Sequence, residues 1–320
     1  MGLLMAGEAA RFTPLSGGVS SDIWKVEVGA RALCVKRALG KLKVAQDWRA
    51  PLERSRYEYA WMTVARAIVP DAAPEALGYD EAAGLIALAW YDPAQYRLWK
   101  TELRDGRVDH DIAAEVGRRL AAIHAGTAGR PDIAAAFSTD AIFHAIRLEP
   151  YLAATARVHT DLAAPLNALI ERTASTRLVL VHGDVSPKNI LVGSSGPLLL
   201  DAECAWYGDP AFDAAFCLNH LLLKCVWRRA STADFITSFR RLAGSYLAGV
   251  TWEPRAAIEP RIASLLAGLF LARVDGKSPV EYIVTESDKD LVRHTARRFV
   301  ATPPATLDEI AAAWLRALDS

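Results

Sequence analysis

Three short apolar runs joined by polar turns constrain the fold of this chain more than any other feature. The runs cover residues 178–181, 190–192 and 198–200. Each run is too short for a helix and is typical of a buried strand. Polar residues stand where these strands end, with Asp184 and Asn189 in the first connection and Asp201 directly after the last run. We therefore expect the strands to gather two carboxylates and one amide at a single place.

Those three side chains are the set that phosphoryl transfer requires. Asp184 would take or orient the proton of the attacking hydroxyl, while Asn189 and Asp201 would hold the Mg²⁺ that bridges the nucleotide phosphates. The interval of five positions from Asp184 to Asn189 is that of a kinase catalytic loop. An isolated Asp and Asn at this spacing is more typical of an ordinary turn. The preceding His182-Gly183 and the flanking strands favour the catalytic interpretation.

Residues 182–215 resemble the aminoglycoside phosphotransferase and choline kinase family, the small-molecule branch of the protein-kinase-like fold. The matching motifs are His-Gly-Asp at 182–184, Asn-Ile-Leu at 189–191, Leu-Leu-Asp-Ala-Glu at 199–203 and Gly-Asp-Pro-Ala-Phe-Asp-Ala-Ala at 208–215. The match continues thinly over the rest of the chain and is weakest toward the C-terminus. The resemblance implies an α+β, bilobal fold with a small β-rich nucleotide-binding lobe at 1–92 and a larger helical catalytic and substrate-binding lobe at 93–320.

The N-terminal lobe is expected to supply a lysine and its carboxylate partner. The apolar run at 33–35 ends in Lys36, whose ammonium would meet the α- and β-phosphates. A helix opened by Pro51 follows. Its predicted buried stripe is Tyr57, Trp61, Val64 and Ile68. Glu58 flanks this stripe and is the predicted partner of Lys36, with Glu53 as the alternative.

A glycine-containing turn and the end of a later strand complete the predicted nucleotide site. The turn resembles the nucleotide-covering loop of small-molecule kinases, since glycine lets backbone amides approach phosphate and serine adds donors. Its candidate residues are Ser16, Gly17, Gly18, Ser20 and Ser21. Two glycines between strands are also typical of an ordinary hairpin, and the family commonly has Asn where Ser21 stands. By resemblance, adenine would bind the hinge backbone at Ala89, Trp90 and Tyr91.

Four further residues are expected to support the catalytic loop. By hydrogen bonding, His182 would brace the loop, and Asp213 would either cap the following helix or tie it to the loop. Glu203 would support the metal shell or pair with a cation. Lys188, where many relatives carry Gly, would either reach the γ-phosphate or face solvent.

Helical periodicity dominates after Pro93. The predicted helices cover 139–155, 159–174, 210–224, 232–247, 256–272, 287–300 and 305–317. An earlier helix is expected to be capped by Asp111 and to end near His124, a core histidine. A charged loop at 273–282 is either a solvated turn or part of the acceptor site, because the C-terminal helices of this fold wall the acceptor pocket. The acceptor-side candidates are Arg273, Asp275 and Lys277.

Charge and composition narrow the class of partner. The 37 Lys and Arg side chains balance 37 Asp and Glu side chains, and nucleic-acid binders normally carry a basic excess. The four cysteines form no pattern typical of zinc binding. The N-terminus lacks a basic leader, and the best apolar run is far shorter than a membrane span. We expect a soluble, cytoplasmic protein with neither nucleic-acid nor membrane partners.

The resemblance and the motifs together predict an ATP- or GTP-dependent, Mg²⁺-dependent phosphotransferase acting on a hydroxyl of a small molecule. Acceptors compatible with the family include an aminoglycoside, methylthioribose, choline and homoserine. The alternative is a non-catalytic nucleotide-binding or scaffold protein that kept the fold. Protein-kinase activity is disfavoured, because Gly183 replaces the Arg of the protein-kinase loop and Ala202-Glu203 replaces Phe-Gly. The acceptor, the nucleotide and the oligomeric state stay open.

Overall fold

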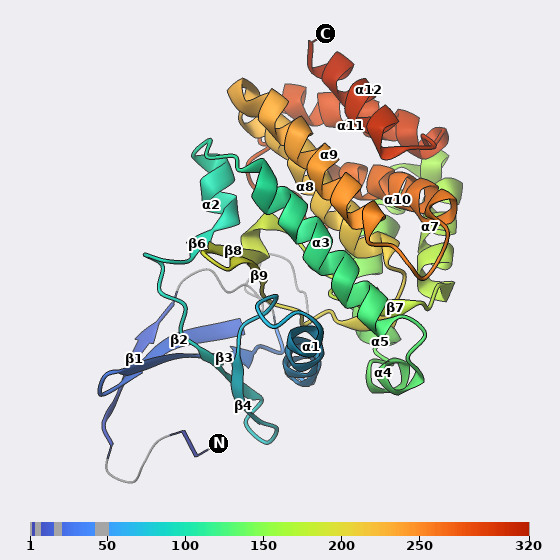
Figure 1. Ribbon diagram of the computed structural model, residues 1–320. Coiled ribbons are helices and arrows are strands. Elements are labelled where there is room, and N and C mark those ends of the chain that lie inside the picture. The colour runs from blue at the N-terminus through green and yellow to red at the C-terminus, as the bar shows by residue number, and fades with distance from the viewer. Residues whose placement is uncertain (1, 4–7, 16–20, 42–50, 320) are drawn as a thin grey trace.

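The N-terminal part of the chain forms an antiparallel sheet in the order β1-β2-β3-β5-β4. The computed structural model describes residues 2–3, 8–15, 21–41 and 51–319. The strands are β1 (Ala10–Pro14), β2 (Ser21–Val28), β3 (Arg31–Ala38), β4 (Ala76–Asp80) and β5 (Leu85–Ala89). Figure 1 shows this sheet at one end of the molecule, with the helices beyond it. Alternating or clustered apolar residues at 22–28, 32–36 and 85–90 predict strands there, and β2, β3 and β5 agree with these ranges to within two residues.

Helix α1 (Arg54–Ile68) differs from its prediction in start and in buried face. The helix begins three residues after Pro51. Of the predicted stripe, Trp61 is fully buried, whereas Tyr57, Val64 and Ile68 are only half-buried, so the buried face is rotated from the predicted one. The buried residues are Arg54, Ser55, Glu58, Trp61, Met62 and Ala65. The periodicity of apolar residues did not predict this face, because the charged residues Arg54 and Glu58 form part of it. Glu58 thus lies on the buried side of the helix.

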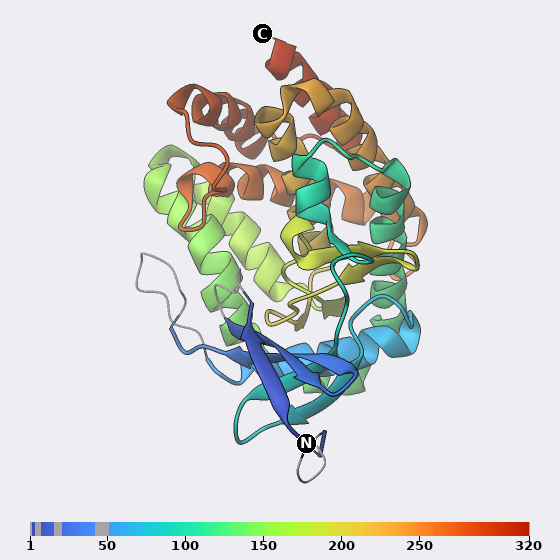
Figure 2. The same ribbon diagram turned by 90° about the vertical axis from the view of Figure 1, so that its left-hand side faces the viewer.

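The remainder of the chain is largely helical, and the views agree that it forms a body beside the sheet (Figures 1 and 2). The helices of its first half are α2 (Trp99–Arg104), α3 (His110–Thr127), α4 (Pro131–Ala136), α5 (Asp140–Phe143), the π-helix η1 (His144–Ala153), α6 (Ala154–Val158), η2 (Thr160–Leu162) and α7 (Ala163–Ser175). Those of its second half are η3 (Pro187–Asn189), α8 (Ala211–Trp227), η4 (Arg229–Ser231), α9 (Thr232–Ala248), α10 (Arg255–Asp275), α11 (Glu286–Ala301) and α12 (Leu307–Asp319). The predicted helices are confirmed, with shifted ends.

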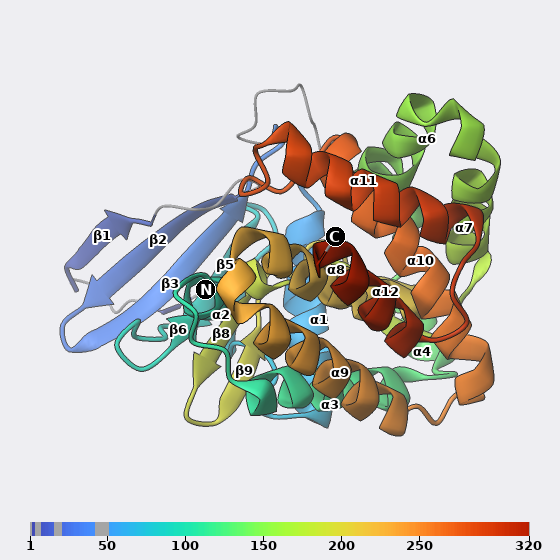
Figure 3. The same ribbon diagram turned by 90° about the horizontal axis from the view of Figure 1, so that it is seen from above.

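Helix α8 lies at the centre of this body, where Figure 3 shows other helices around it. It packs along α9 and α10, and almost every one of its residues is buried. An evenly buried helix needs apolar residues all round, which the run from Ala211 to Trp227 supplies. Asp111 was predicted to cap α3, and this is wrong. The cap is Asp109, whose carboxylate accepts the backbone N–H of Asp111 at 2.8 Å. No helix among the described residues combines the length and the hydropathy of a membrane span.

Two small sheets position the polar loops between these layers. Strand β7 (Val179–Val181) pairs with β10 (Trp206–Gly208), and β6 (Arg97–Leu98) pairs with the hairpin of β8 (Ile190–Gly193) and β9 (Gly196–Leu199). Their antiparallel register places Ile190 opposite Leu199. The residues just outside this pair, Asn189 and Leu200, therefore lie at the same end of the hairpin.

Candidate active site

The β8–β9 hairpin brings Asn189 and Asp201 together. The backbone N–H of Leu200 donates to the carbonyl of Asn189 at 2.8 Å, which extends the ladder by one residue. Asp201 follows with φ of 68°, the left-handed region that Asp adopts more readily than most residues. This turn ends the strand and sends the carboxylate of Asp201 toward the sheet lobe, where it pairs with Lys36.

Asp213 at the start of α8 holds the loop before Asp184. Its carboxylate accepts the N–H groups of His182 and Gly183, each at 2.7 Å. Gly183 has φ of 80°, and a Cβ there would lie 2.7 Å from Cys204, so only glycine suits this position. His182 in turn accepts the N–H of Asp184 through Nδ1 at 3.1 Å. These contacts agree with the bracing roles predicted for His182 and Asp213.

The two carboxylate oxygens of Asp184 have different surroundings. Oδ2 pairs with Arg147 at 2.9 Å and with Lys188 at 3.0 Å. Oδ1 is buried and has no hydrogen-bond partner within the described ranges. Burial favours the neutral carboxyl, but Lys188 and Arg147 outweigh it and lower the pKa of Asp184 below its usual range. Asp184 is thus an ionised group with one free acceptor oxygen.

Arg147 was not predicted from the sequence. It lies in the π-helix η1 and is buried, and its Nε donates to the carbonyl of Gly183. π-helical turns widen a helix and often occur at functional sites. The run around Pro150 reads as part of an ordinary helix, so the only sequence signal was an arginine among apolar residues.

Lys36 joins the sheet lobe to the helical lobe. Its ammonium donates to both carboxylate oxygens of Glu58, at 2.8 and 2.9 Å, and also pairs with Asp201. Burial disfavours the charge on Lys36, yet Asp201 and Glu58 outweigh it and raise its pKa. Burial also raises the pKa of Glu58, whereas Lys36 and Lys188 overcome the same effect at Asp201 and lower its pKa. Glu58 and Asp201 share the ammonium of Lys36, and Asp201 has the lower pKa of the two, so it stays ionised at lower pH than Glu58.

A second buried ion pair joins Arg54 of α1 to Glu203 at 2.8 Å. Arg54 also donates to the carbonyls of Pro51 and Leu39 at 2.9 and 2.6 Å. Of the two roles predicted for Glu203, the structure shows the pairing with a cation. The pair links α1 to the segment that carries Asp201.

The remaining nucleotide-site predictions fall partly outside the described residues. Ser16, Gly17, Gly18 and Ser20 lie there. Ser21 begins β2, and its buried Oγ has no hydrogen-bond partner in the described structure. Ala89 ends β5, and its N–H donates to the carbonyl of Glu75 at 2.9 Å. The Tyr91 hydroxyl accepts the N–H of Glu75 at 3.1 Å, and Trp90 lies beside Lys25, so the adenine contacts at 89–91 stay a prediction.

The acceptor-side candidates separate in the structure. Asp275 accepts from His159 and from Arg293 of α11, each at 2.9 Å, within a charged network. Lys277 is half-exposed and pairs with Glu149 at 2.9 Å. Arg273 is buried and donates to the hydroxyls of Tyr151 and Ser278. Asp275 and Lys277 therefore have protein partners of opposite charge, whereas Arg273 has none in the described ranges.

The donors at Asn189 and Asp201 suit Mg²⁺. Nδ2 of Asn189 donates to the carbonyl of Asp184 at 3.1 Å, which leaves the amide oxygen as an acceptor. Magnesium commonly takes only one or two protein carboxylates and completes its shell with water and phosphate oxygens. Within the described residues no group of three or more His, Cys, Asp or Glu could hold a metal, so a substrate would have to complete this shell.

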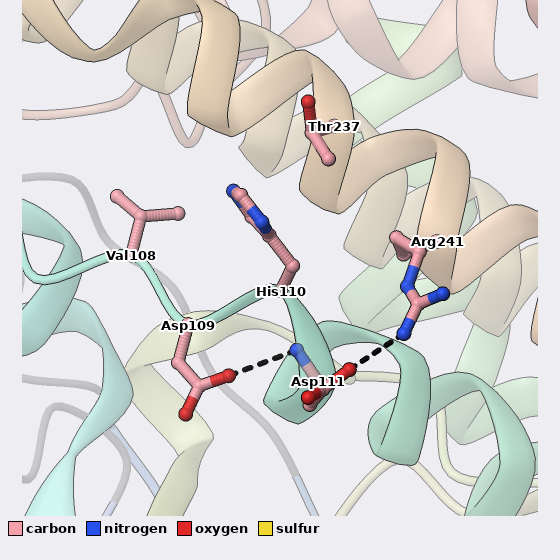
Figure 4. A pocket seen from close by; sticks show the side chains of 6 residues that line it. All are labelled: Val108, Asp109, His110, Asp111, Thr237 and Arg241. Atoms are coloured by element: carbon pink, nitrogen blue, oxygen red, sulfur yellow. Dashed lines mark hydrogen bonds and ion pairs between the residues drawn. The ribbon is translucent and has the colours of Figure 1, made fainter.

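A hollow of about 610 Å³ lies away from these residues, where the start of α3 meets α9 (Figure 4). It is lined by Val108, Asp109, His110, Asp111, Thr237 and Arg241. Asp109 caps the helix and Arg241 pairs with Asp111. The hollow shares no lining residue with the site around Asp184.

Residues 11–258 match the model of the phosphotransferase enzyme family, APH. The chain belongs to this family. The match covers the sheet lobe, the hairpin with Asn189 and most of the helical lobe, so the resemblance expected from residues 182–215 is confirmed.

Named relatives agree with this membership. A methylthioribose kinase of Pectobacterium atrosepticum is 26% identical in an alignment of length 226 that covers 62% of this chain and 56% of that kinase. A second methylthioribose kinase, from Pectobacterium carotovorum, is 25% identical over 85% of this chain and 75% of its own length. The chain thus spans little more than half of the first of these relatives.

Among solved structures, a choline/ethanolamine kinase family protein from Mesorhizobium loti has a TM-score of 0.52 and 17% identity. The superposition covers 98% of this chain and 94% of that one. At this identity the likeness concerns the fold, and it confirms the predicted α+β, kinase-like architecture.

Proposed function

We propose that this protein is an ATP- or GTP-dependent phosphotransferase that uses Mg²⁺ and phosphorylates a hydroxyl group of a small molecule. The observation that carries the proposal is Asp184, a buried carboxylate held by Arg147 and Lys188 through one oxygen and free at the other. Family membership and the named kinases among the relatives support the same reaction class.

Asp184 would orient the acceptor hydroxyl through Oδ1. As the hydroxyl oxygen forms its bond to the terminal phosphorus of the nucleotide, the proton passes to Asp184 and the nucleoside diphosphate leaves. A carboxylate with a lowered pKa is a weak base, so its main task is to hold the hydroxyl in line and to receive the proton late. Arg147 fixes the direction of the carboxylate through Oδ2.

Lys36 would neutralise the nucleotide phosphates, and Glu58 holds it in place from α1. Asp201 and Asn189 would hold Mg²⁺, which neutralises charge on the phosphates when bound. Ser21 offers a hydroxyl without a described partner at the start of β2, beside the predicted phosphate loop. Each of these assignments rests on family membership together with the side-chain contacts described above.

The test is the change Asp184→Asn, which keeps the shape and removes the charge. We expect the variant to fold and to bind Mg-nucleotide, while turnover falls by a factor on the order of 10² to 10⁴. Nucleotide binding is measured by calorimetry, and diphosphate release is measured with a panel of hydroxylated metabolites and aminoglycosides. The matched control is Asp132→Asn, an exposed aspartate of α4 paired with Arg130.

Full turnover in Asp184→Asn would show that the carboxylate is not part of the chemistry. Nucleotide binding without turnover in the unmodified protein, across the whole panel, would favour the non-catalytic alternative.

A further inference from the structure

Two buried cations where α8 packs on α10 have no acidic partner in the part of the chain that the structure describes. Lys224 of α8 is 1% exposed and Arg273 of α10 is 7% exposed. Glu281, the acidic group whose charge reaches Lys224, already pairs with Lys100. Burying a charge without an opposite charge is unfavourable, and buried charges in proteins are normally paired or neutralised, so an anion would stabilise both groups here.

The aromatic rings beside Lys224 do not replace an anion. Its Nζ lies 3.9 Å from the ring centroids of both Trp227 and Tyr282. Those rings stack on each other with centroids 4.4 Å apart. Each ring attracts the ammonium through its quadrupole, but neither carries the negative charge that would neutralise it.

Polar atoms without partners surround these cations. Nε of Arg273, Nε2 of His220 and the hydroxyl of Tyr282 are buried and make no hydrogen bond within the described ranges. His220 precedes Lys224 by one helical turn on the same face of α8. The positive charge of Arg273 helps to lower the pKa of both His220 and Lys224, so Arg273 interacts electrostatically with each of them. We refer to Lys224, Arg273, His220 and Tyr282 as the basic cluster.

Buried aromatic side chains lie between the basic cluster and the Asp184–Arg147 pair. Arg147, which pairs with Asp184, lies 5.7 Å from the ring centroid of Phe216. Phe216 lies 5.5 Å from His220, centroid to centroid, and 5.5 Å from Tyr151. Phe216, His220 and Lys224 follow one another at intervals of four residues, so the cluster lies roughly 6 to 12 Å farther along α8 than Phe216.

We propose that the acceptor of this phosphotransferase is an anionic hydroxyl compound, whose carboxylate or phosphate binds to the basic cluster while its hydroxyl meets Asp184. The inference rests on the proposed function, because it names the substrate class of the same site. The middle of the acceptor would be apolar or aromatic, to match Phe216 and Tyr151.

The charges of the cluster favour this class over two others. A polyamine such as an aminoglycoside would add positive charge to Lys224 and Arg273. A neutral diol would leave both cations without a counter-charge. An anionic oxygen group instead accepts from Arg273, Lys224 and the Tyr282 hydroxyl, and bonds between charged partners are the strong ones.

The experiment compares four probes with the same alkyl chain and a terminal hydroxyl: hydroxyhexanoate, hydroxyhexyl phosphate, hexanediol and aminohexanol. Binding is measured by calorimetry without nucleotide, and phosphoryl transfer is measured with Mg-ATP and Mg-GTP. We expect an anionic probe to bind at least roughly tenfold more tightly than the diol, and the amine to bind most weakly. The stronger of the two anionic probes identifies the headgroup as carboxylate or phosphate.

The variant Lys224→Met keeps the length of the side chain and removes the charge. We expect it to weaken binding of the preferred anion about tenfold or more while leaving the diol unchanged. Its melting temperature should not fall, because a buried charge without a partner is removed. The control is Lys289→Met, a lysine of α11 paired with Glu286 at 2.7 Å.

Equal binding of anionic and neutral probes, or an equal loss for both in Lys224→Met, would overturn the inference. These outcomes are distinct from failure of the proposed function. If the anion preference holds but no phosphoryl transfer depends on Asp184, the basic cluster is an anion site in a protein that is not this enzyme.

Discussion

At the scale of single residues, Asp184 shows how a carboxylate can be oriented without being fully engaged. Arg147 and Lys188 both approach Oδ2, and Oδ1 stays free for a substrate. Two cations on one oxygen hold the group ionised and fix its direction.

Lys224 gives a prediction for the dependence of acceptor binding on pH. Burial, together with the charges of Lys100 and Arg273, lowers its pKa to about 7 against the opposing effect of Glu281. Lys224 is therefore charged below about pH 7 and neutral above it, whereas an ordinary lysine keeps its charge up to about pH 10. We expect the Kd of an anionic acceptor to be constant below about pH 7 and to rise, by up to about tenfold per pH unit, above it.

The groups that face Lys224 define the control for this pH profile. They are Lys100, His220, Trp227, Arg273, Glu281 and Tyr282. The pKa of His220 lies well below its usual range because of burial and these cations, so His220 stays neutral over the measured interval. The rise in Kd should therefore disappear in Lys224→Met. A profile that is the same in both proteins would assign the pH dependence to another group.

Single residues were predictable where a motif fixed their spacing, and not where the fold brought them together. The motifs of segment 182–215 predicted that Asp184, Asn189 and Asp201 converge, because the pairing of short strands sets where these residues lie. Arg147 and Lys224 belong to no such motif. Arg147 lies on the buried face of a π-helix and Lys224 lies in a helix that is buried almost all round, and the periodicity of apolar residues predicts a buried charge in neither.

At the scale of elements, the pair Arg54–Glu203 should couple α1 to the segment after β9. Both side chains are buried, and the carboxylate is 2.8 Å from the guanidinium. In a double-mutant cycle with Arg54→Met and Glu203→Gln we expect a coupling free energy of about 1 to 3 kcal/mol. The free energy of unfolding is measured with urea for the two single variants, the double variant and the unmodified protein.

The partly exposed pair Lys25–Glu27 on β2 serves as the comparison for this cycle. Partly exposed pairs contribute about 0.2 to 1 kcal/mol, so its coupling should be smaller. Equal coupling in the two cycles would mean that the Arg54–Glu203 contact adds no special connection between α1 and the site.

Helix α1 also shows why the face of an element is harder to predict than its presence. An apolar stripe is expected to face the core, and Tyr57, Val64 and Ile68 follow that pattern in sequence. The actual buried face carries Arg54 and Glu58, because each has a charged partner on another element. Paired charges can be buried, and their partners lie far away in the chain, so a local pattern does not reveal them.

At the scale of the whole molecule, the predicted fold is confirmed, and the position of the division at residue 92 stays a prediction. Composition and period predicted strands before residue 92 and helices after it, because alternation and helical spacing are local signals. Strand β4 was not predicted, since Ala76–Asp80 contains glycine and little alternation. The packing of α8, α9 and α10 around one another likewise depends on contacts between distant segments.

The contact of Lys36 with Asp201 joins the two lobes, so a nucleotide bound at this contact would stabilise the folded protein. A ligand that binds only the folded protein stabilises it by about 2.7 kcal/mol at a hundred times its Kd, which corresponds to a rise in melting temperature of roughly 4 °C for a chain of this size. Saturating Mg-nucleotide should produce this rise, and EDTA should reduce it.

In Lys36→Met the rise should fall to less than about half. The starting melting temperature of that variant will differ, because Glu58 and Asp201 then lack their shared cation, so the measured quantity is the shift on adding nucleotide. Lys25→Met on the neighbouring strand should keep the full shift. If Lys36→Met also keeps it, the nucleotide does not bind between β3 and Asp201, and the assignment of the whole site would have to be abandoned.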